Sequence, residues 1–399
     1  MPSTDPGAAK TNSSPLPVPF SRPDLGEAEE AAVLRCLRSG WLTTGPETAE
    51  LERCFAEAVG VHHAVAVSSC TAAMHLALEG LGVGPGDRVI TSVLTFTATA
   101  EAIRLCGAEP LLVDVAPETL DLDVTEVERH LSADSRIRAI LPVHYAGQAC
   151  RMDQLLELAS RYDVRIVEDA AHAFPARFQG RCVGSLGDAT AFSLYANKPL
   201  TTGEGGLLTT NNEALAQWAR RARLHGIERT ASTEQGQTRW RYEVTDAGYK
   251  YNLPDLAATL ARPQLERADQ ARARREAIAA YYSKQLAGLP LSLPAVRDNA
   301  SDHSWHLFPV QLELEALNLS RDGFIDALAE RGIGASVHFI PLHRHRYWRE
   351  SLGLRTEDFP VAEAAGQRLV SLPIYPGLTD AQVERVADTV TTLLRAHRR

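Results

Sequence analysis

Short apolar runs alternate with amphipathic segments along the first half of the chain. The runs predict buried strands, because each is only a few residues long and is bounded by turn-forming residues. The segments between them carry apolar residues at helical spacing. The predicted strands lie at 63–67, 88–91, 110–115, 137–143, 165–167, 189–194 and 207–210. This alternation of strand and helix predicts an α/β fold with a mostly parallel sheet flanked by helices.

Helices and a second, smaller region complete the predicted organisation. Helices are predicted at 27–39, closed by Gly40, at 48–59, and as one long segment over 255–286. Strands are predicted at 306–310 and 335–339. We expect a flexible tail over 1–19, a large cofactor-binding domain over 20–260, and a connector helix with a small α+β domain over 261–399.

Several chemically useful side chains fall at predicted strand ends. Ser69, Phe96, His144, Asp169 and Lys198 all stand there. In a parallel sheet the carboxyl ends of the strands meet at one edge, where ligands bind, so these residues are predicted to converge on one site. Taken singly, each has a plain structural reading: Lys198 as a surface lysine, Asp169 as a helix cap and Phe96 as core.

A lysine and a carboxylate in this arrangement suit pyridoxal phosphate. This cofactor needs a lysine for its aldehyde and a carboxylate to keep its ring nitrogen protonated. The strand at 63–67 runs into Ser68-Ser69-Cys70-Thr71 and then directly into a helix. A helix N-terminus of this kind presents free N–H groups and a positive dipole end to an anion such as a phosphate.

Composition and charge exclude several classes of protein. A chain of 399 residues with 45% hydrophobic content can bury a large core. Its 41 basic and 50 acidic residues give a net charge of −9, which disfavours a nucleic-acid partner. Six scattered cysteines without a CxxC pair suit a reducing cytoplasm. No apolar run approaches the roughly 18–20 residues that span a bilayer. His338, His343 and His345 lack a paired acid or cysteine, so we expect no metal site.

A series of motifs from residue 20 to the C-terminus resembles the DegT/DnrJ/StrS family of pyridoxal-phosphate-dependent nucleotide-sugar aminotransferases. The sequences EDAAHA, GYKYNLPDL and SVHFIPLH are most similar to the corresponding motifs of the branch that makes 4-amino-4-deoxy-arabinose nucleotides. The matching motifs are SGWLTTGP (39–46), SSCTAAMHLAL (68–78), TFTATAEAI (95–103), PVHYAG (142–147), EDAAHA (168–173), FSLYANK (192–198), GEGG (203–206), HGI (225–227), GYKYNLPD (248–255), VHFIPLH (337–343) and SLPIYP (371–376). The resemblance implies an aspartate-aminotransferase-like fold of type I.

The resemblance also implies roles for individual residues. Lys198 matches the lysine that binds the cofactor covalently, and Asp169 matches the partner of the ring nitrogen. Phe96 matches the aromatic that covers one ring face, and His172 stands close to the ring hydroxyl. The phosphate cup would comprise Ser69, Cys70, Thr71 and Ser193, with Cys70 in place of the common Gly or Ala.

The same resemblance implies a homodimer with shared active sites. Lys250 stands where many members place an Asn that reaches the neighbouring subunit's phosphate. Trp41, Thr44, His338 and His343 match substrate-facing segments.

The implied reaction moves an amino group from an amino acid, by resemblance L-glutamate, to a keto sugar nucleotide, expected to be a 4-keto sugar. Three alternatives stay open: a keto-cyclitol or a 3-keto sugar nucleotide as acceptor, a dehydratase of the same fold, and a regulatory protein without activity. The dehydratase branch carries His in place of the lysine, so Lys198 argues against it. A complete set of Lys198, Asp169 and phosphate cup argues against a non-enzyme.

Overall fold

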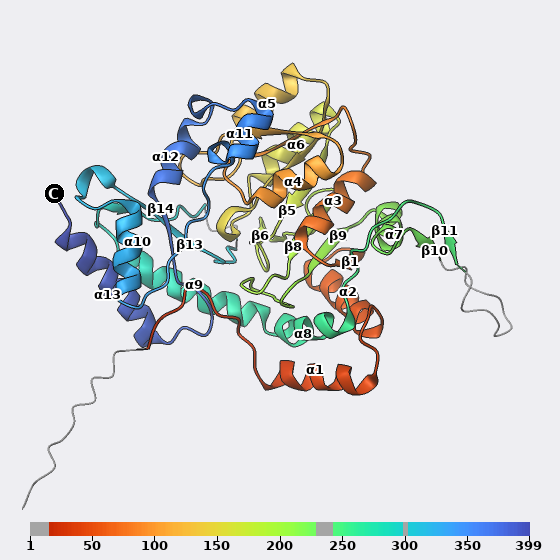
Figure 1. Cartoon of the computed structure of the whole chain (residues 1–399), viewed down its shortest axis with the longest axis horizontal. Helices are drawn as coiled ribbons and strands as arrows, with labels where there is room; N and C mark the ends of the chain where they lie inside the picture. The colour runs from red at the N-terminus through yellow and green to blue at the C-terminus, as the bar shows by residue number, and fades with distance from the viewer. Residues whose placement is uncertain (1–15, 229–241, 298–301) are drawn as a thin grey trace, which may run out of the picture.

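The computed structural model describes residues 16–228, 242–297 and 302–399, which form two principal sheets of unequal size wrapped by helices (Figure 1). The larger sheet has seven strands. Strand β9 runs antiparallel to both of its neighbours, and the other six run parallel to one another. In sheet order the strands are β1 (His63–Val67), β9 (Gly206–Thr210), β8 (Ala189–Ser193), β5 (Arg165–Asp169), β4 (Ile137–Leu141), β2 (Arg88–Ser92) and β3 (Glu109–Val113).

Helices cover both faces of this sheet and bury two separate apolar clusters against it. One cluster draws on α2 (Pro46–Val59), α5 (Val124–Ala133), α6 (Met152–Tyr162) and α8 (Asp255–Glu266). The other draws on α3 (Cys70–Gly80), α4 (Thr97–Leu105) and α7 (Glu213–Ala222). Helix α1 (Glu27–Ser39) packs along α8 at the edge of the molecule (Figure 1). The parallel sheet flanked by helices that the sequence predicts is therefore confirmed.

The C-terminal region is built on an antiparallel sheet with its own core. Three strands, in the order β12-β13-β14, pack with helices α9, α10 and α13 around residues such as Phe308, Phe324 and Leu394. The elements of this region are α9 (Ala268–Gln285), β12 (Leu291–Ser292), β13 (Phe308–Leu312), η2 (Leu314–Ala316), α10 (Arg321–Glu330), η3 (Leu342–Arg344), α11 (Arg346–Leu352), η4 (Thr356–Asp358), α12 (Pro360–Arg368), β14 (Leu369–Leu372) and α13 (Asp380–Ala396).

Smaller elements complete the fold. They are the 3-10 turn η1 (Tyr145–Gly147) and two short ribbons, β6 (Arg177–Phe178) with β7 (Arg181–Cys182), and β10 (Ile227–Glu228) with β11 (Glu243–Val244).

A fourth apolar cluster joins the C-terminal region to the carboxyl ends of the large sheet. It combines Val93 and Leu94, which follow β2, with Leu342 and Trp348 of the C-terminal region. The Leu342 N–H donates to the Val93 carbonyl at 2.8 Å, and the Trp348 indole N–H donates to the Thr97 hydroxyl at 3.0 Å. These contacts bring the segment that carries His338 and Phe339 to the edge of the sheet.

Three sequence-based predictions need correction. The single helix expected over 255–286 is two helices, α8 and α9, which meet at Arg267. Pro263 lies inside α8, where it has no N–H to donate to the preceding turn. The strand expected at 335–339 is an irregular segment that pairs with β14 only at Ser336. The predicted tail is too long at its end, because Val18 is buried and pairs with Ile333.

Two other predicted segments fall mostly outside the residues that the structure describes. The rest of the predicted tail, residues 1–15, lies outside them. The polar, non-periodic stretch at 228–239 also predicts a loop, and its residues from 229 on lie outside them as well. The predicted division between residues 260 and 261 falls inside α8, before the break at Arg267.

Candidate active site

A cavity of about 490 Å³ opens at the carboxyl ends of the parallel strands. It lies between the sheet, the N-terminus of α3 and the segment at 338–339 from the C-terminal region. Nine of the residues predicted from the sequence line it: Ser69, Cys70, Thr71, Phe96, Asp169, His172, Ser193, Lys198 and His338.

The alternation of side chains along β5 decides which acid faces this cavity. Val167 packs in the cluster beneath α3, and Asp169, two residues later, projects to the same face. Glu168 projects to the opposite face, where it is fully buried and bonds to His144 at 2.8 Å. It also accepts hydrogen bonds from the Gly187 N–H and the Thr190 hydroxyl. Asp169 is therefore the acid available to a ligand, and Glu168 is a structural acid.

Asp169 is held by donors from three different elements. Its Oδ2 accepts a hydrogen bond from the Thr99 hydroxyl of α4 at 2.7 Å. Its Oδ1 accepts one from the backbone N–H of Ala171 at 3.1 Å and lies 3.9 Å from the Cys70 thiol at the start of α3. The side chain is almost completely buried, so these contacts fix its direction.

Lys198 stands in the turn after β8, where its backbone N–H donates to the Tyr195 carbonyl at 2.9 Å. Burial in the cavity lowers the pKa of its amine to about 8, against the opposing influence of the neighbouring Cys70 and Asp169 side chains. A lysine with such a pKa carries an appreciable fraction of neutral amine near neutral pH. It can therefore act as a nucleophile or as a base.

Hydroxyl and N–H donors gather at one end of the cavity, around the N-terminus of α3. The Ser69 hydroxyl caps α3 by accepting from the Ala72 N–H at 3.0 Å, which leaves its own proton free to donate. Thr71 and Ser193 line the same cavity. A Cβ on Gly206 would lie only 2.4 Å from the Ser69 carbonyl, so glycine is needed where β9 passes this helix end.

Two histidines and an aromatic ring form the wall on the side of the C-terminal region. The His172 ring stacks on Phe339 at 5.7 Å and contacts His306 at 4.6 Å. Burial, and then the neighbouring Lys198 and His338 side chains, hold the pKa of His172 well below its usual range, so its imidazole is neutral. Burial likewise lowers the pKa of His338 to about 4, and its Nδ1 lies 3.0 Å from the Ser371 hydroxyl.

Five of the predicted residues lie elsewhere. Within the described chain, the cavity lining includes none of Trp41, Thr44, His144, Lys250 and His343. His343 is buried, bonds to Glu363 at 2.9 Å and stacks on Phe359.

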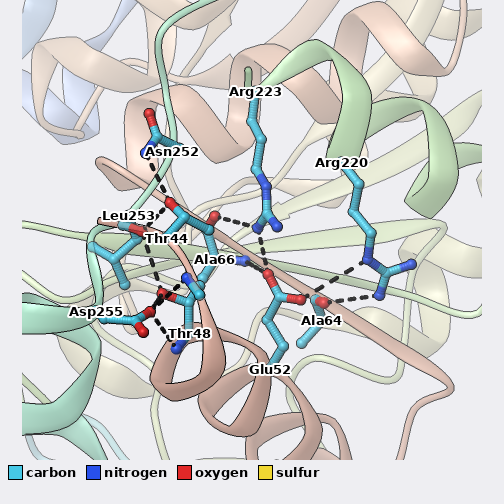
Figure 2. A network of polar contacts seen from close by, with 11 residues as sticks. Thr44, Thr48, Glu52, Ala64, Ala66, Arg220, Arg223, Asn252, Leu253 and Asp255 are labelled. Carbon is cyan, nitrogen blue, oxygen red and sulfur yellow. Dashed lines mark hydrogen bonds and ion pairs between the residues drawn. The ribbon is translucent and has the colours of Figure 1, made fainter. Parts of the chain in front are cut away.

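Trp41, Thr44 and Lys250 lie near one another on a different surface. The Trp41 indole donates to the Thr44 carbonyl, and Lys250 donates to Asn252 at 2.6 Å. Asn252 in turn donates to the Thr44 hydroxyl at 2.7 Å (Figure 2).

Sequence reasoning missed several residues that line the cavity: Thr95, Thr99, Tyr195, Asn197, Glu204 and Phe339. Thr95 stands two residues before α4 and Thr99 lies in its first turn, and this spacing of four residues brings the two hydroxyl oxygens within 2.7 Å of each other. That spacing, next to the predicted Phe96, is a signal by which the pair could have been found. Phe339 could not have been found in this way, because only the packing of the C-terminal region against the sheet brings its ring to the cavity.

The residues present fit pyridoxal phosphate. The cavity places an amine of lowered pKa and an oriented carboxylate on the same face of the sheet. The donors around Ser69 and Thr71 at the helix end suit a phosphate. The Nδ1 atom of His172 is buried without a partner among the described residues, which leaves an imidazole available beside these groups. The phenyl ring of Phe96 is 61% exposed in this chain, which a stacked heteroaromatic ring would reduce.

Comparison with known proteins agrees with this geometry. The sequence profile of the DegT/DnrJ/EryC1/StrS aminotransferase family matches residues 23–391. The spore coat polysaccharide biosynthesis protein SpsC of Bacillus subtilis is 43% identical over 381 residues, covering 95% of this chain and 97% of SpsC. The uncharacterized protein MJ1066 of Methanocaldococcus jannaschii is 42% identical over 383 residues, covering 96% of this chain and 98% of that protein.

A solved structure is also similar to this chain over nearly its whole length. The putative sugar aminotransferase Spr1654 from Streptococcus pneumoniae, in its PMP-form, superposes with a TM-score of 0.89 and is 32% identical. The superposition covers 95% of this chain and 99% of that one. The fold is thus that of the type I pyridoxal-phosphate enzymes. Among the helices of the described residues, none is long and apolar enough to cross a membrane.

Proposed function

The chain belongs to the DegT/DnrJ/EryC1/StrS aminotransferase family, and from this membership we propose that it transfers the amino group of L-glutamate to the keto group of a nucleotide-linked 4-keto sugar in the cytoplasm. The enzyme is a pyridoxal-phosphate-dependent sugar aminotransferase. The observation that carries the proposal is the placement of Lys198 and Asp169 on one face of the sheet, in a single cavity that ends at the phosphate-binding start of α3.

The protein's own residues have separable tasks in this reaction. Bound pyridoxal phosphate supplies an electron sink that stabilises negative charge on the substrate carbon that loses a proton. Asp169 accepts a hydrogen bond from the ring nitrogen and so favours its protonated form. Lys198, with a pKa of about 8, takes the proton from the substrate carbon and returns it. Ser69, Thr71 and Ser193 hold the phosphate.

The sugar acceptor is supported by relatives and by the mouth of the cavity. SpsC is named for polysaccharide biosynthesis, and Spr1654 is named a putative sugar aminotransferase. Phe96 and Tyr195 line the cavity with rings that are 61% and 48% exposed, and such rings stack on sugars and nucleobases. The choice of carbon 4 rests on the motifs EDAAHA, GYKYNLPDL and SVHFIPLH.

A homodimer with shared sites belongs to the same proposal. Lys250 is exposed, lies outside the lining of its own chain's cavity and donates to Asn252. Asn252 is itself bonded to the Thr44 hydroxyl (Figure 2). We propose that Lys250 reaches the phosphate in a second copy of the chain, where its charge would complement a phosphate dianion. Trp41 and Thr44 stand beside it and would face the same neighbour.

A panel of acceptors tests the reaction. The holoenzyme is incubated with ¹⁵N-glutamate and, separately, a 4-keto sugar nucleotide, a 3-keto sugar nucleotide and a keto-cyclitol. Mass spectrometry should find ¹⁵N in the product of the 4-keto sugar. Label in either of the other products instead would overturn the choice of acceptor.

Borohydride reduction followed by peptide mapping tests the site. The cofactor should be fixed to Lys198, and the Lys198→Ala variant should fold but fix none. A covalent adduct on any other lysine would overturn the assignment of Lys198.

A further inference from the structure

Two buried hydroxyls stand in line behind the carboxylate of Asp169. The Thr95 and Thr99 hydroxyl oxygens are 2.7 Å apart, and Thr99 is also 2.7 Å from Asp169 Oδ2. Thr95 is 2% exposed and Thr99 is fully buried. Both threonines line the cavity. Thr99 donates to Asp169 as described above, and Thr95 has had no role so far.

The number of available protons fixes the direction of this chain. The Thr99 hydroxyl oxygen lies 2.7 Å from Asp169 Oδ2 and 3.2 Å from the Phe96 carbonyl oxygen, and both of these oxygens only accept. The shorter contact, to the charged carboxylate, is the stronger one and takes the Thr99 proton. Thr99 has no second proton to offer, and the contact with Thr95 therefore requires Thr95 to donate to Thr99. The result is a one-way chain from Thr95 through Thr99 to Asp169. It lies in a water-poor site, where hydrogen bonds to charged groups are strong.

The other carboxylate oxygen is already supplied with donors. Oδ1 accepts from the Ala171 N–H at 3.1 Å and has the Cys70 thiol at 3.9 Å. Burial, and then the charge of Asp169, hold the pKa of Cys70 well above its usual range. The thiol thus keeps its proton and can donate it weakly. Each carboxylate oxygen accepts about two hydrogen bonds, so Oδ2 is the oxygen with acceptor capacity left.

We propose that Thr99, with its proton direction set by Thr95, is the positioning residue of Asp169, and that it leaves Oδ2 as the oxygen that accepts from the ring nitrogen of the cofactor. The Cys70 thiol assists at Oδ1. This inference rests on the proposed function, because it takes pyridoxal phosphate to be the ligand beside Asp169.

Thr99→Val tests the proposal, because valine keeps the shape and removes the hydroxyl. We expect a kcat lower by about tenfold to a hundredfold, the loss typical of a hydrogen bond to a charged group, with the KM for the keto sugar little changed. The dissociation constant of pyridoxal phosphate should rise about threefold to tenfold on the same basis. In the holoenzyme, the pH at which the cofactor absorbance changes should also shift. Thr99→Ser should restore all three properties, and Thr95→Val should have a smaller effect.

Thr91→Val is the matched control. Thr91 is also a fully buried threonine, and its hydroxyl donates to the Leu141 carbonyl at 2.7 Å, away from the cavity. This variant should lose stability comparable to that lost by Thr99→Val and keep the cofactor affinity of the wild type. Cys70→Ala should change cofactor affinity less than Thr99→Val, because a sulfur donor at 3.9 Å is weak.

The outcomes separate this inference from the function on which it rests. A wild-type protein that binds no pyridoxal phosphate would overturn the proposed function. A wild type that binds it, beside a Thr99→Val variant with unchanged affinity, kcat and absorbance titration, would overturn only the role of Thr99. Failure of Thr99→Ser to recover these properties would likewise assign the effect to packing and overturn the proposal.

Discussion

Glu168 and Asp169 are adjacent acids at the end of β5, and the pleat of the strand sends them to opposite faces. The carboxylate oxygens of Glu168 are hydrogen-bonded to His144, Gly187 and Thr190 in the core. Asp169 instead faces the cavity, where Thr99 and Ala171 leave it part of its acceptor capacity. One residue of register therefore separates a structural acid from the acid that we propose for the cofactor.

Asp169→Asn and Glu168→Gln should accordingly fail in different ways. Asp169→Asn should lower kcat on the order of a hundredfold or more, because an amide cannot hold the ring nitrogen protonated, while the phosphate end still binds. Glu168→Gln should instead lower thermal stability, since an amide NH₂ would meet donors in a buried site at a cost of about 1–3 kcal/mol. Steady-state kinetics and thermal unfolding of both variants provide the comparison. An Asp169→Asn variant with near-normal turnover would contradict the assignment.

The lowered pKa of Lys198 gives a pH prediction. Covalent capture of pyridoxal phosphate needs the neutral amine, whose fraction rises with pH and levels off above the pKa. For Lys198 the rate of capture should level off a little above pH 8, because burial lowers the pKa of its amine to about 8. An unperturbed lysine, with a pKa of about 10.4, would still be gaining neutral amine near pH 10. Stopped-flow absorbance of the apoprotein measures the rate, with Lys198→Ala as the background. A rate that climbs steeply above pH 9 would contradict the shift.

At the scale of whole elements, the chain of polar contacts around Asp255 joins two helices. Asp255 is the first residue of α8, and its carboxylate accepts from the N–H groups of Gly45, Glu47 and Thr48 and from the Thr48 hydroxyl (Figure 2). These N–H groups lie at the N-terminus of α2, where a carboxylate also meets the positive end of the helix dipole. The bond fixes the turn that carries Thr44 beside the segment that carries Lys250.

Asp255→Ala should therefore loosen the start of α2 locally. Amide hydrogen exchange at Glu47 and Thr48 should quicken by about tenfold to a hundredfold, as expected when a charged hydrogen bond that protects them is lost. Asp326→Ala on the exposed face of α10 is the control and should leave this exchange unchanged. Unaltered protection at α2 in the Asp255 variant would mean that α2 does not depend on this cap.

Most elements of the large sheet were predictable from the sequence because each is a short apolar run. The strand expected at 63–67 matches β1 in both bounds, and the helix expected at 27–39 matches α1 with its Gly40 cap. The break at Arg267 was missed, since a proline within a helical pattern does not show where the axis bends. The segment at 335–339 has strand-like residues but finds a partner only at Ser336.

For the whole molecule, the site could be predicted where strands of one sheet bring its residues together. Lys198 and Asp169 follow parallel strands, so topology alone places them at one edge. His343 could not be assigned in this way, because its partner Glu363 comes from α12, which only the tertiary fold brings close. Thr99 lies within a recognised motif, yet its role depends on the contact between α4 and the end of β5.

The proposed sharing of sites between two chains has a test at the scale of the assembly. Lys198→Ala and Lys250→Ala homodimers should each be impaired, the first because it lacks the amine and the second because its phosphate loses a countercharge. If Lys250 serves the neighbouring cavity, a mixed dimer has one site with both lesions and one with neither. Activity should then reappear when the two preparations exchange subunits, toward about one intact site per mixed dimer.

Two controls make this result decisive. Native mass spectrometry of the mixture must show mixed dimers, and the Lys250→Ala homodimer must be measurably impaired alone. Lys284→Ala, which removes another lysine near the end of α9, should leave the activity unchanged. If mixed dimers form and no activity returns, Lys250 acts within its own chain. To supply a countercharge, its side chain would then have to leave Asn252 and turn back toward its own phosphate site.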